Sequence, residues 1–173
     1  KKPLIYYTIK SALSSKFINE VYVSTDSINI SRIAKKYGAK VKFLRDKNLS
    51  KDNTPETLVW RDSILRIEKL NKINYDCLCV LPITSPLRSK KDIDDCIEIF
   101  RKKKCDGVIT ITPSSKNPYF NMVRIVGNNL ELINKHKKNF FNRQKAPKTY
   151  DITTVAYIMS TKFIKKKSSI FKG

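Results

Sequence analysis

Residues 77–100 read CLCVLPITSPLRSKKDIDDCIEIF, and they contain a strand, a turn and a helix in direct succession. The opening run, residues 77–81, is short and apolar, which is typical of a buried strand. Two prolines end it, because proline lacks the backbone N–H that a strand uses for pairing. Ser89-Lys90-Lys91-Asp92 then resembles a capping box, which indicates the start of a helix. Apolar residues recur behind it at helical spacing: Ile93, Cys96, Ile97 and Phe100.

The same alternation of strand and helix extends to both sides of this stretch. Apolar patterns predict strands at residues 21–24, 41–44 and 107–112. Helices are predicted from about residue 3, before Gly38, and behind Thr54-Pro55, where threonine would be the N-cap and proline the first helical residue. Regular alternation of this kind implies right-handed crossovers, so the expected fold class is α/β with a mainly parallel sheet flanked by helices.

The pattern changes after Pro113. Short strands are predicted at residues 119–125 and 130–133, around a turn at Gly127-Asn128-Asn129. A polar segment, 135–148, precedes a last strand at 154–159. We expect a small β-rich excursion from the sheet that serves substrate contact or dimerisation.

Size and composition favour one globular domain, residues 1–173, in which 40% of the residues are hydrophobic. The four cysteines fit small buried hydrophobes of a reducing, cytoplasmic environment. No apolar run reaches the roughly 18 to 20 residues of a membrane helix, so no membrane partner is expected. His136 is the single histidine, and no CxxC is present, so no zinc site and no role for His136 are predicted.

The net charge of +21 raises the alternative of a basic nucleic-acid-binding domain. Of the 36 basic residues, 28 are lysines, and these are scattered over every predicted helix face. Nucleic-acid readers favour arginine and interleaved aromatic residues in a recognisable module. The pattern therefore predicts a solvated basic surface and no nucleic-acid partner, with some attraction for anionic substrates.

Polar side chains follow three of the predicted strands where each strand ends. These are Ser24-Thr25-Asp26, then Arg45, then Thr84-Ser85 with Arg88. Ligands of open parallel sheets bind outside the carboxyl ends of the strands, and hydroxyl, carboxylate and guanidinium groups there suit a nucleotide or an acidic sugar. Taken singly, each has a structural alternative. Thr25-Asp26-Ser27 could simply cap the next helix, and Arg88 could pair with Asp92 or Asp94.

Several segments together resemble the sugar-acid cytidylyltransferases, the CMP-N-acylneuraminate synthetase family, over roughly residues 2–160. They keep the family's order and spacing: KPLIYYTI (2–9), VYVSTDS (21–27), AKKYGA (34–39), FLR (43–45), DNTP (52–55), TSPLR (84–88), NPYF (117–120) and RQKAP (143–147). The resemblance implies a Rossmann-like nucleotidyltransferase fold, dimeric through the excursion, with Mg²⁺ as cofactor. The implied reaction joins CTP and an acidic nine-carbon 2-keto sugar, releasing pyrophosphate. An eight-carbon keto-sugar acid is the alternative substrate, which the Ser-Pro-Leu-Arg form argues against.

The resemblance also assigns site residues position by position. They are Arg143 as catalytic, Arg45 and Asp26 at the nucleotide, and Thr84, Ser85, Asp151 and Tyr157 at the sugar. For Asp26 a structural cap competes with a metal-linked role, and we favour the cap. For Tyr157 a packing role competes with substrate contact.

Two departures from the family pattern shape the expectations. Neuraminate enzymes carry Arg-Pro-Asn-Gly where this chain has Asp151-Ile152-Thr153-Thr154, which predicts a legionaminate-like or pseudaminate-like sugar instead of N-acetylneuraminate. The family's first strand with its phosphate loop, and its paired metal-binding aspartates, would lie outside residues 1–173. On this reading no metal ligand is present, and the 173 residues alone are expected to turn over no CTP.

Overall fold

The computed structural model describes residues 1–134, 140, 142–167 and 169–171, so His136 lies outside the described residues. The chain forms two compact units. The core unit consists of Lys1–Thr110 and Thr154–Gly173, and the insert unit of Ile111–Thr153.

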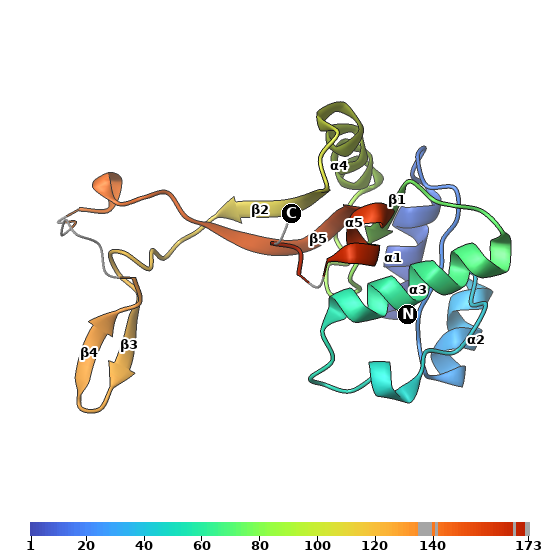
Figure 1. The fold of residues 1–173 in the computed structure, drawn as a ribbon, viewed down its shortest axis with the longest axis horizontal. Coiled ribbons are helices and arrows are strands. Elements are labelled where there is room, and N and C mark those ends of the chain that lie inside the picture. The colour runs from blue at the N-terminus through green and yellow to red at the C-terminus, as the bar shows by residue number, and fades with distance from the viewer. Residues whose placement is uncertain (135–139, 141, 168, 172–173) are drawn as a thin grey trace. The chain divides into compact units, whose positions relative to one another are not determined.

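The core unit is organised around a three-stranded sheet in the order β1-β5-β2 (Figure 1). The strands are β1 (Cys77–Val80), β2 (Gly107–Pro113) and β5 (Tyr150–Ser160). β1 and β5 are antiparallel, with Cys77 opposite Ser160 and Val80 opposite Tyr157. Successive residues of β5 alternate between two apolar clusters, since side chains of a strand point to opposite faces. The buried half of β5 is therefore covered on both faces.

Helices pack against both faces of β5. On one face Tyr157 and Met159 pack with Trp60 and Ile64 of α3 (Glu56–Asn71) and with residues of α5 (Thr161–Lys166). On the other face Ala156 and Ile158 pack with apolar residues of α4 (Lys90–Lys103): Ile93, Cys96 and Ile97. The result is a helix–sheet–helix arrangement, the α/β class that the alternation predicts.

Most of the helix ends predicted from capping residues are confirmed by the structure. α4 begins with the predicted capping box, in which Ser89 accepts from Asp92 N and the Asp92 carboxylate accepts from Ser89 N at 2.8 Å. Gly38 follows α2 (Ile28–Lys36) with φ +94°, as a residue beyond a helix C-cap requires. The predicted start of α3 is wrong by one residue. Pro55 is itself the N-cap, and the Thr54 hydroxyl donates to the Asn48 carbonyl, so it caps no helix.

The predicted strands at residues 21–24 and 41–44 are wrong as strands. They are reduced to one parallel bridge, Tyr22–Lys40, held by two backbone hydrogen bonds of 2.8 and 3.0 Å. A single bridge is too short for a ladder, and residues of α1 (Leu4–Leu13) and α2 pack against the two segments. The short helix η1 (Lys47–Leu49) follows in the chain. This bridge is parallel, whereas β1 and β5 pair antiparallel.

In the insert unit a hairpin joins β3 (Val123–Val126) to β4 (Asn129–Leu132). Gly127 has φ +59°, which a two-residue hairpin loop requires. The strand predicted from residue 119 begins four residues later. Residues 117–122 form turns around buried Asn117, whose carbonyl accepts from three backbone N–H groups and whose side chain donates to Pro147 O at 2.7 Å. The polar segment contains η2 (Arg143–Lys145).

Glu20 anchors a polar cluster in the core unit. Its carboxylate pairs with Lys40 and accepts hydrogen bonds from Tyr22, Tyr75 and Asn71. The Lys40 hydrogen bond, followed by those of the two tyrosines, lowers the pKa of Glu20 to about 2. The cluster joins segments that are up to 55 residues apart in the sequence.

We expect Glu20→Gln to lose about 1 kcal/mol of unfolding free energy at pH 7, the range of a hydrogen-bonded, partly exposed charge. Because the folded-state pKa of Glu20 is depressed, its stabilisation is complete above the ordinary value of 4.5 and is lost as the pH falls toward 2. Denaturant unfolding at a series of pH values should show the difference between wild type and variant shrinking over that window. A difference that stays constant from pH 6 to pH 2 would contradict the assignment.

Candidate active site

Three hydroxyl groups converge where β1 ends and β5 passes it. Ser85 Oγ lies 2.7 Å from Thr154 Oγ1, and Thr84 Oγ1 donates to the same atom at 3.4 Å. Thr84 and Thr154 are exposed, and Ser85 is half-buried. Thr84 and Ser85 were predicted as site residues, whereas Thr154 was missed. Its partner lies 69 residues away in the sequence, so no local pattern could indicate the pair.

Arg88 lies beneath this group and is 6% exposed. Its guanidinium donates to the carbonyls of Pro82 and Thr154, the latter at 3.0 Å, and to Thr8 Oγ1 at 3.4 Å. The suggested pairing of Arg88 with Asp92 or Asp94 is not formed. Asp92 closes the capping box, and Asp94 accepts from Ser15 at 2.5 Å. Burial lowers the pKa of Arg88.

Asp26 and Arg45, predicted at the nucleotide, come together in the core unit. Arg45 Nη2 lies 3.9 Å from Asp26 Oδ1, and Arg45 Nε donates to Ser50 Oγ at 3.0 Å. The preference for Asp26 as a helix cap is wrong, because the N-cap of α2 is Ser27, whose hydroxyl accepts from Ile30 N. Asp26 is 45% exposed at the side chain and is free to hold the guanidinium.

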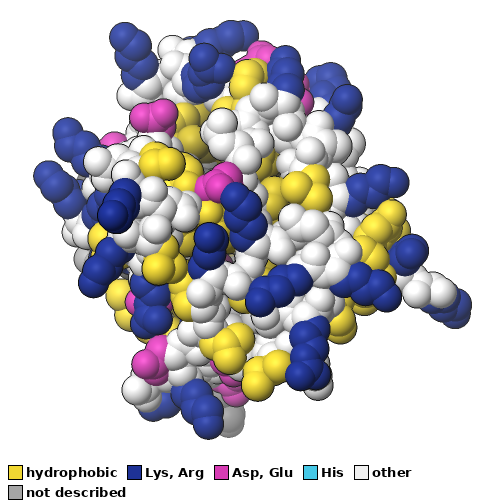
Figure 2. Space-filling model, turned by 90° about the vertical axis from the view of Figure 1, so that its right-hand side faces the viewer, with side chains coloured by type: hydrophobic (Ala, Val, Ile, Leu, Met, Phe, Trp, Pro, Cys, Tyr) yellow, Lys and Arg dark blue, Asp and Glu magenta, His cyan; other side chains and the backbone are white. Residues whose placement is uncertain are grey.

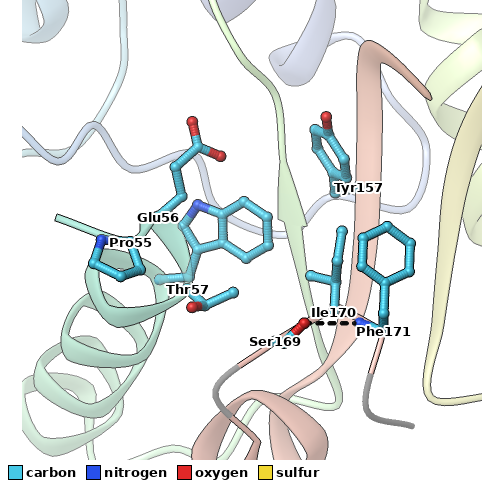
Figure 3. A pocket seen from close by; sticks show the side chains of 8 residues that line it. Pro55, Glu56, Thr57, Tyr157, Ser169, Ile170 and Phe171 are labelled. Atoms are coloured by element: carbon cyan, nitrogen blue, oxygen red, sulfur yellow. Dashed lines mark hydrogen bonds between the residues drawn. The ribbon is translucent and has the colours of Figure 1, made fainter. Parts of the chain in front are cut away.

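Tyr157 lies on β5 against α3. Its ring is 5.6 Å from that of Trp60, and both side chains are buried. The two rings line a cavity of about 260 Å³. Figure 3 shows Ile170 and Phe171 on the same side of this cavity as Tyr157, with Pro55 and Glu56 at the start of α3. Tyr157 thus packs in the core and borders this cavity, and a contact between Tyr157 and the substrate stays a prediction.

Arg143 and Asp151 belong to the insert unit. Arg143 opens η2, is exposed, and donates from Nη2 to the Ser114 carbonyl at 2.8 Å. That bond uses one of five guanidinium N–H groups, so the others remain for an anion. Asp151 is exposed near the beginning of β5.

A family model described as "Cytidylyltransferase" matches residues 1–171. The chain belongs to the cytidylyltransferase family. Among curated relatives, a CMP-N,N'-diacetyllegionaminic acid synthase of Campylobacter jejuni is 37% identical over 99% of this chain and 72% of its own length. A pseudaminic acid cytidylyltransferase of the same species is 43% identical over 57% of this chain and 42% of its own length. These relatives place the chain among the nonulosonic acid CMP-transferases.

The fold of this cytidylyltransferase also has a solved counterpart. A CMP-2-keto-3-deoxy-manno-octonic acid synthetase complexed with CTP superimposes with a TM-score of 0.65, over 94% of this chain and 65% of that one. At 15% identity the likeness concerns the fold alone. It confirms the predicted Rossmann-like nucleotidyltransferase fold. The expectation of a mainly parallel sheet differs from the structure at β1 and β5, which pair antiparallel.

The described part of the cytidylyltransferase contains no group of three or more His, Cys, Asp or Glu side chains that could hold a metal ion. Asp26 is a single carboxylate and already faces Arg45. The donor set that a divalent cation such as Mg²⁺ prefers, several oxygen ligands, is thus not formed by these residues.

The basic surface of the cytidylyltransferase is dispersed. Figure 2 shows Lys and Arg side chains spread over one face, with neutral and hydrophobic side chains between them. Several are bound to acidic partners, for example Lys16 to Glu98 at 3.1 Å and Lys165 to Glu68 at 2.6 Å. Among the described helices, none has the length and apolarity to cross a membrane.

Proposed function

We propose that this protein transfers CMP from CTP to the anomeric hydroxyl of an acidic nine-carbon 2-keto sugar. The observation that carries the proposal is the hydroxyl cluster of Thr84, Ser85 and Thr154 beyond the end of β1, in a chain of the cytidylyltransferase family. Such a cluster suits a polyhydroxylated ring, since each hydroxyl can both donate and accept. The Arg45–Asp26 pair supplies a guanidinium for the nucleotide.

The proposed reaction is an in-line displacement. The sugar hydroxyl releases its proton to water and forms a bond to the α-phosphorus of CTP, while the bond from that phosphorus to the pyrophosphate oxygen breaks and pyrophosphate leaves with its electron pair. Negative charge on the phosphate oxygens grows during this step, and a fixed guanidinium stabilises it. Arg143 is the group we assign to that role. Mg²⁺ is the cofactor that the family resemblance implies, and we assign it no step.

For the sugar, we infer a legionaminate-like or pseudaminate-like acid. Two relatives carry these sugars in their names. The chain itself has Asp151 and Thr154 where the neuraminate pattern has arginine and glycine. An added carboxylate repels some substituents that a guanidinium would bind, so the set of accepted sugars should differ.

The test is CMP-sugar formation by the full-length protein with CTP and a panel of acids. The panel contains N,N'-diacetyllegionaminate, pseudaminate, N-acetylneuraminate and an eight-carbon keto-sugar acid. We expect one of the first two to give the highest kcat/KM, and CTP at 100 times its Kd to stabilise the fold by about 2.7 kcal/mol, with no effect of ATP. A preference for N-acetylneuraminate would overturn the sugar assignment. Absence of turnover with all four would overturn the function.

We further propose a homodimer formed through the hairpin of the insert unit. Paired residues of antiparallel strands share a face, so Val123, Ile125, Leu130 and Leu132 form one apolar face. Ile125 is 79% and Leu130 70% exposed, an unusual surface for a monomer. A second copy of the chain is the expected cover.

Ile125→Asp should weaken dimerisation at least about 30-fold, since it places a charge in the centre of the proposed interface. Val126→Asp is the matched control, because Val126 lies on the opposite face of the same hairpin. Sedimentation equilibrium across a concentration series measures both. Equal dimerisation of wild type and Ile125→Asp, or a monomeric wild type, would refute this interface.

A further inference from the structure

The hydroxyl cluster beyond β1 has unused hydrogen-bonding capacity. Three hydroxyls offer three donors and six acceptor lone pairs. The two bonds among Thr84, Ser85 and Thr154 use two donors and two lone pairs, which leaves one donor and four lone pairs. Thr84 and Thr154 are exposed, so this capacity faces solvent. A ring hydroxyl, itself donor and acceptor, matches such a surface.

The position of Thr154 is fixed from below by Arg88. One guanidinium nitrogen, Nη2, donates both to the Thr154 carbonyl and to the Pro82 carbonyl, which ties β5 to the turn after β1. Nη1 reaches Thr8 of α1, and the Arg88 carbonyl accepts from Ser11 of the same helix at 3.2 Å. Arg88 therefore joins three elements at one buried point.

The burial of Arg88 is unfavourable by itself. None of the described carboxylates lies within ion-pair distance of its guanidinium, and its Nε is buried without a hydrogen-bond partner. Burying a charge without a counter-charge lowers stability. An apolar residue would fill the same space more favourably, so the gain lies in the geometry that the fork imposes on Pro82 and Thr154.

We propose that Thr154 is a specificity-determining residue, whose hydroxyl binds a ring hydroxyl of the sugar acid, and that Arg88 is the positioning residue that holds it against Ser85. The inference rests on the proposed function and names the group that reads the sugar. A site built to bind a substrate hydroxyl discriminates against substrates that cannot use it, because its polar atoms are then left unpaired.

The first experiment uses the full-length protein with CTP and the preferred sugar acid of the panel above. Thr154→Val removes the hydroxyl at nearly constant volume and should raise the KM of the sugar about 10-fold, with kcat and the KM of CTP changed less than about twofold. Thr154→Ser keeps the hydroxyl and should return the sugar KM to within about threefold of wild type. Thr112→Val, on β2, is the matched control and should leave all constants unchanged.

The second experiment tests the positioning role. Arg88→Lys keeps the charge but not the fork, and should raise the sugar KM at least about 10-fold with a smaller effect on kcat. The double variant with Thr154→Val should be no worse than the poorer single variant, because both changes disable one group. If the increase in sugar KM of the double variant equals the product of the two single increases, Arg88 is not a positioning residue for Thr154. If Arg88→Lys does not fold, as judged by circular dichroism, the Thr154 variants still decide the proposal.

The outcomes separate this inference from the proposed function. A wild-type protein that forms no CMP-sugar refutes the function. An active wild type whose sugar KM is unchanged in Thr154→Val, or whose CTP KM alone rises, refutes the inference and leaves the function standing.

Discussion

Replacing Arg143 by glutamine should lower kcat for CMP-sugar formation by about 10²–10³, the loss typical of one charge-stabilising group in an active site. Glutamine can still donate a hydrogen bond to the Ser114 carbonyl, which Arg143 binds at 2.8 Å, so the local fold of η2 should persist. What is removed is the positive charge that the proposed transition state requires. The measurement is steady-state kinetics of the full-length protein with saturating CTP and sugar.

Arg124→Gln is the matched control for this prediction. Arg124 lies in the same unit and pairs with Glu131 at 3.3 Å, with its own side chain 60% exposed. Exposed ion pairs contribute about 0–1 kcal/mol to stability. The pair of Arg124 with Glu131 has no proposed role in the reaction. We expect kcat within twofold of wild type. A kcat for Arg143→Gln that matches the control would remove Arg143 from the catalytic role, while a raised KM for CTP alone would make it a binding residue.

Replacing Ile158 by alanine should lower the free energy of unfolding by about 3–4 kcal/mol, within the range for large-to-small changes at fully buried sites. Ile158 is 0% exposed and packs between Ile93 of α4 and the neighbouring strands. It lies on the same strand as Thr154, four residues further on, so the packing of β5 also bears on the candidate site. Equilibrium denaturation in urea, followed by circular dichroism, gives the value.

Ile28→Ala makes the same chemical change at an exposed position. Ile28 is 57% exposed at the first turn of α2, and its replacement should alter the unfolding free energy by less than about 0.5 kcal/mol. Equal losses at the two positions would mean that β5 is not packed between α3 and α4 as described. Because both positions undergo the same Ile→Ala change, the larger loss expected at residue 158 reports mainly the cavity left there.

Features encoded within a few residues could be predicted from the sequence. The capping box spans four residues, Ser89 to Asp92, and the turn at Gly127 depends on one backbone conformation. The apolar stripe of α4 follows from helical periodicity, and both of its neighbours in the chain were predicted as strands. Thr84, Ser85 and Arg45 were also predicted as site residues, because they follow predicted strands and lie in segments that resemble the family.

Features that depend on distant residues could not be predicted in this way. The antiparallel pairing of β1 with β5 joins Cys77 to Ser160, and an alternating pattern is compatible with either strand direction. The N-cap of α2 is Ser27 and not Asp26, and the Asp26 carboxylate lies 3.9 Å from Arg45 Nη2. Asp26 and Arg45 were both predicted at the nucleotide, but the ion pair between them was not, because it joins two segments that only the fold brings together.

By itself, the sequence determined the class of the protein, its local helix signals and the family to which it belongs. The tertiary structure decided which side chains meet. Ser85 and Thr154 are 69 residues apart, and the Arg88 guanidinium ties β5 to the turn that holds Ser85 through the carbonyls of Pro82 and Thr154, which folding brings within reach. Hydrogen bonds depend on distance and angle in space, and neither is written in the order of residues along the chain.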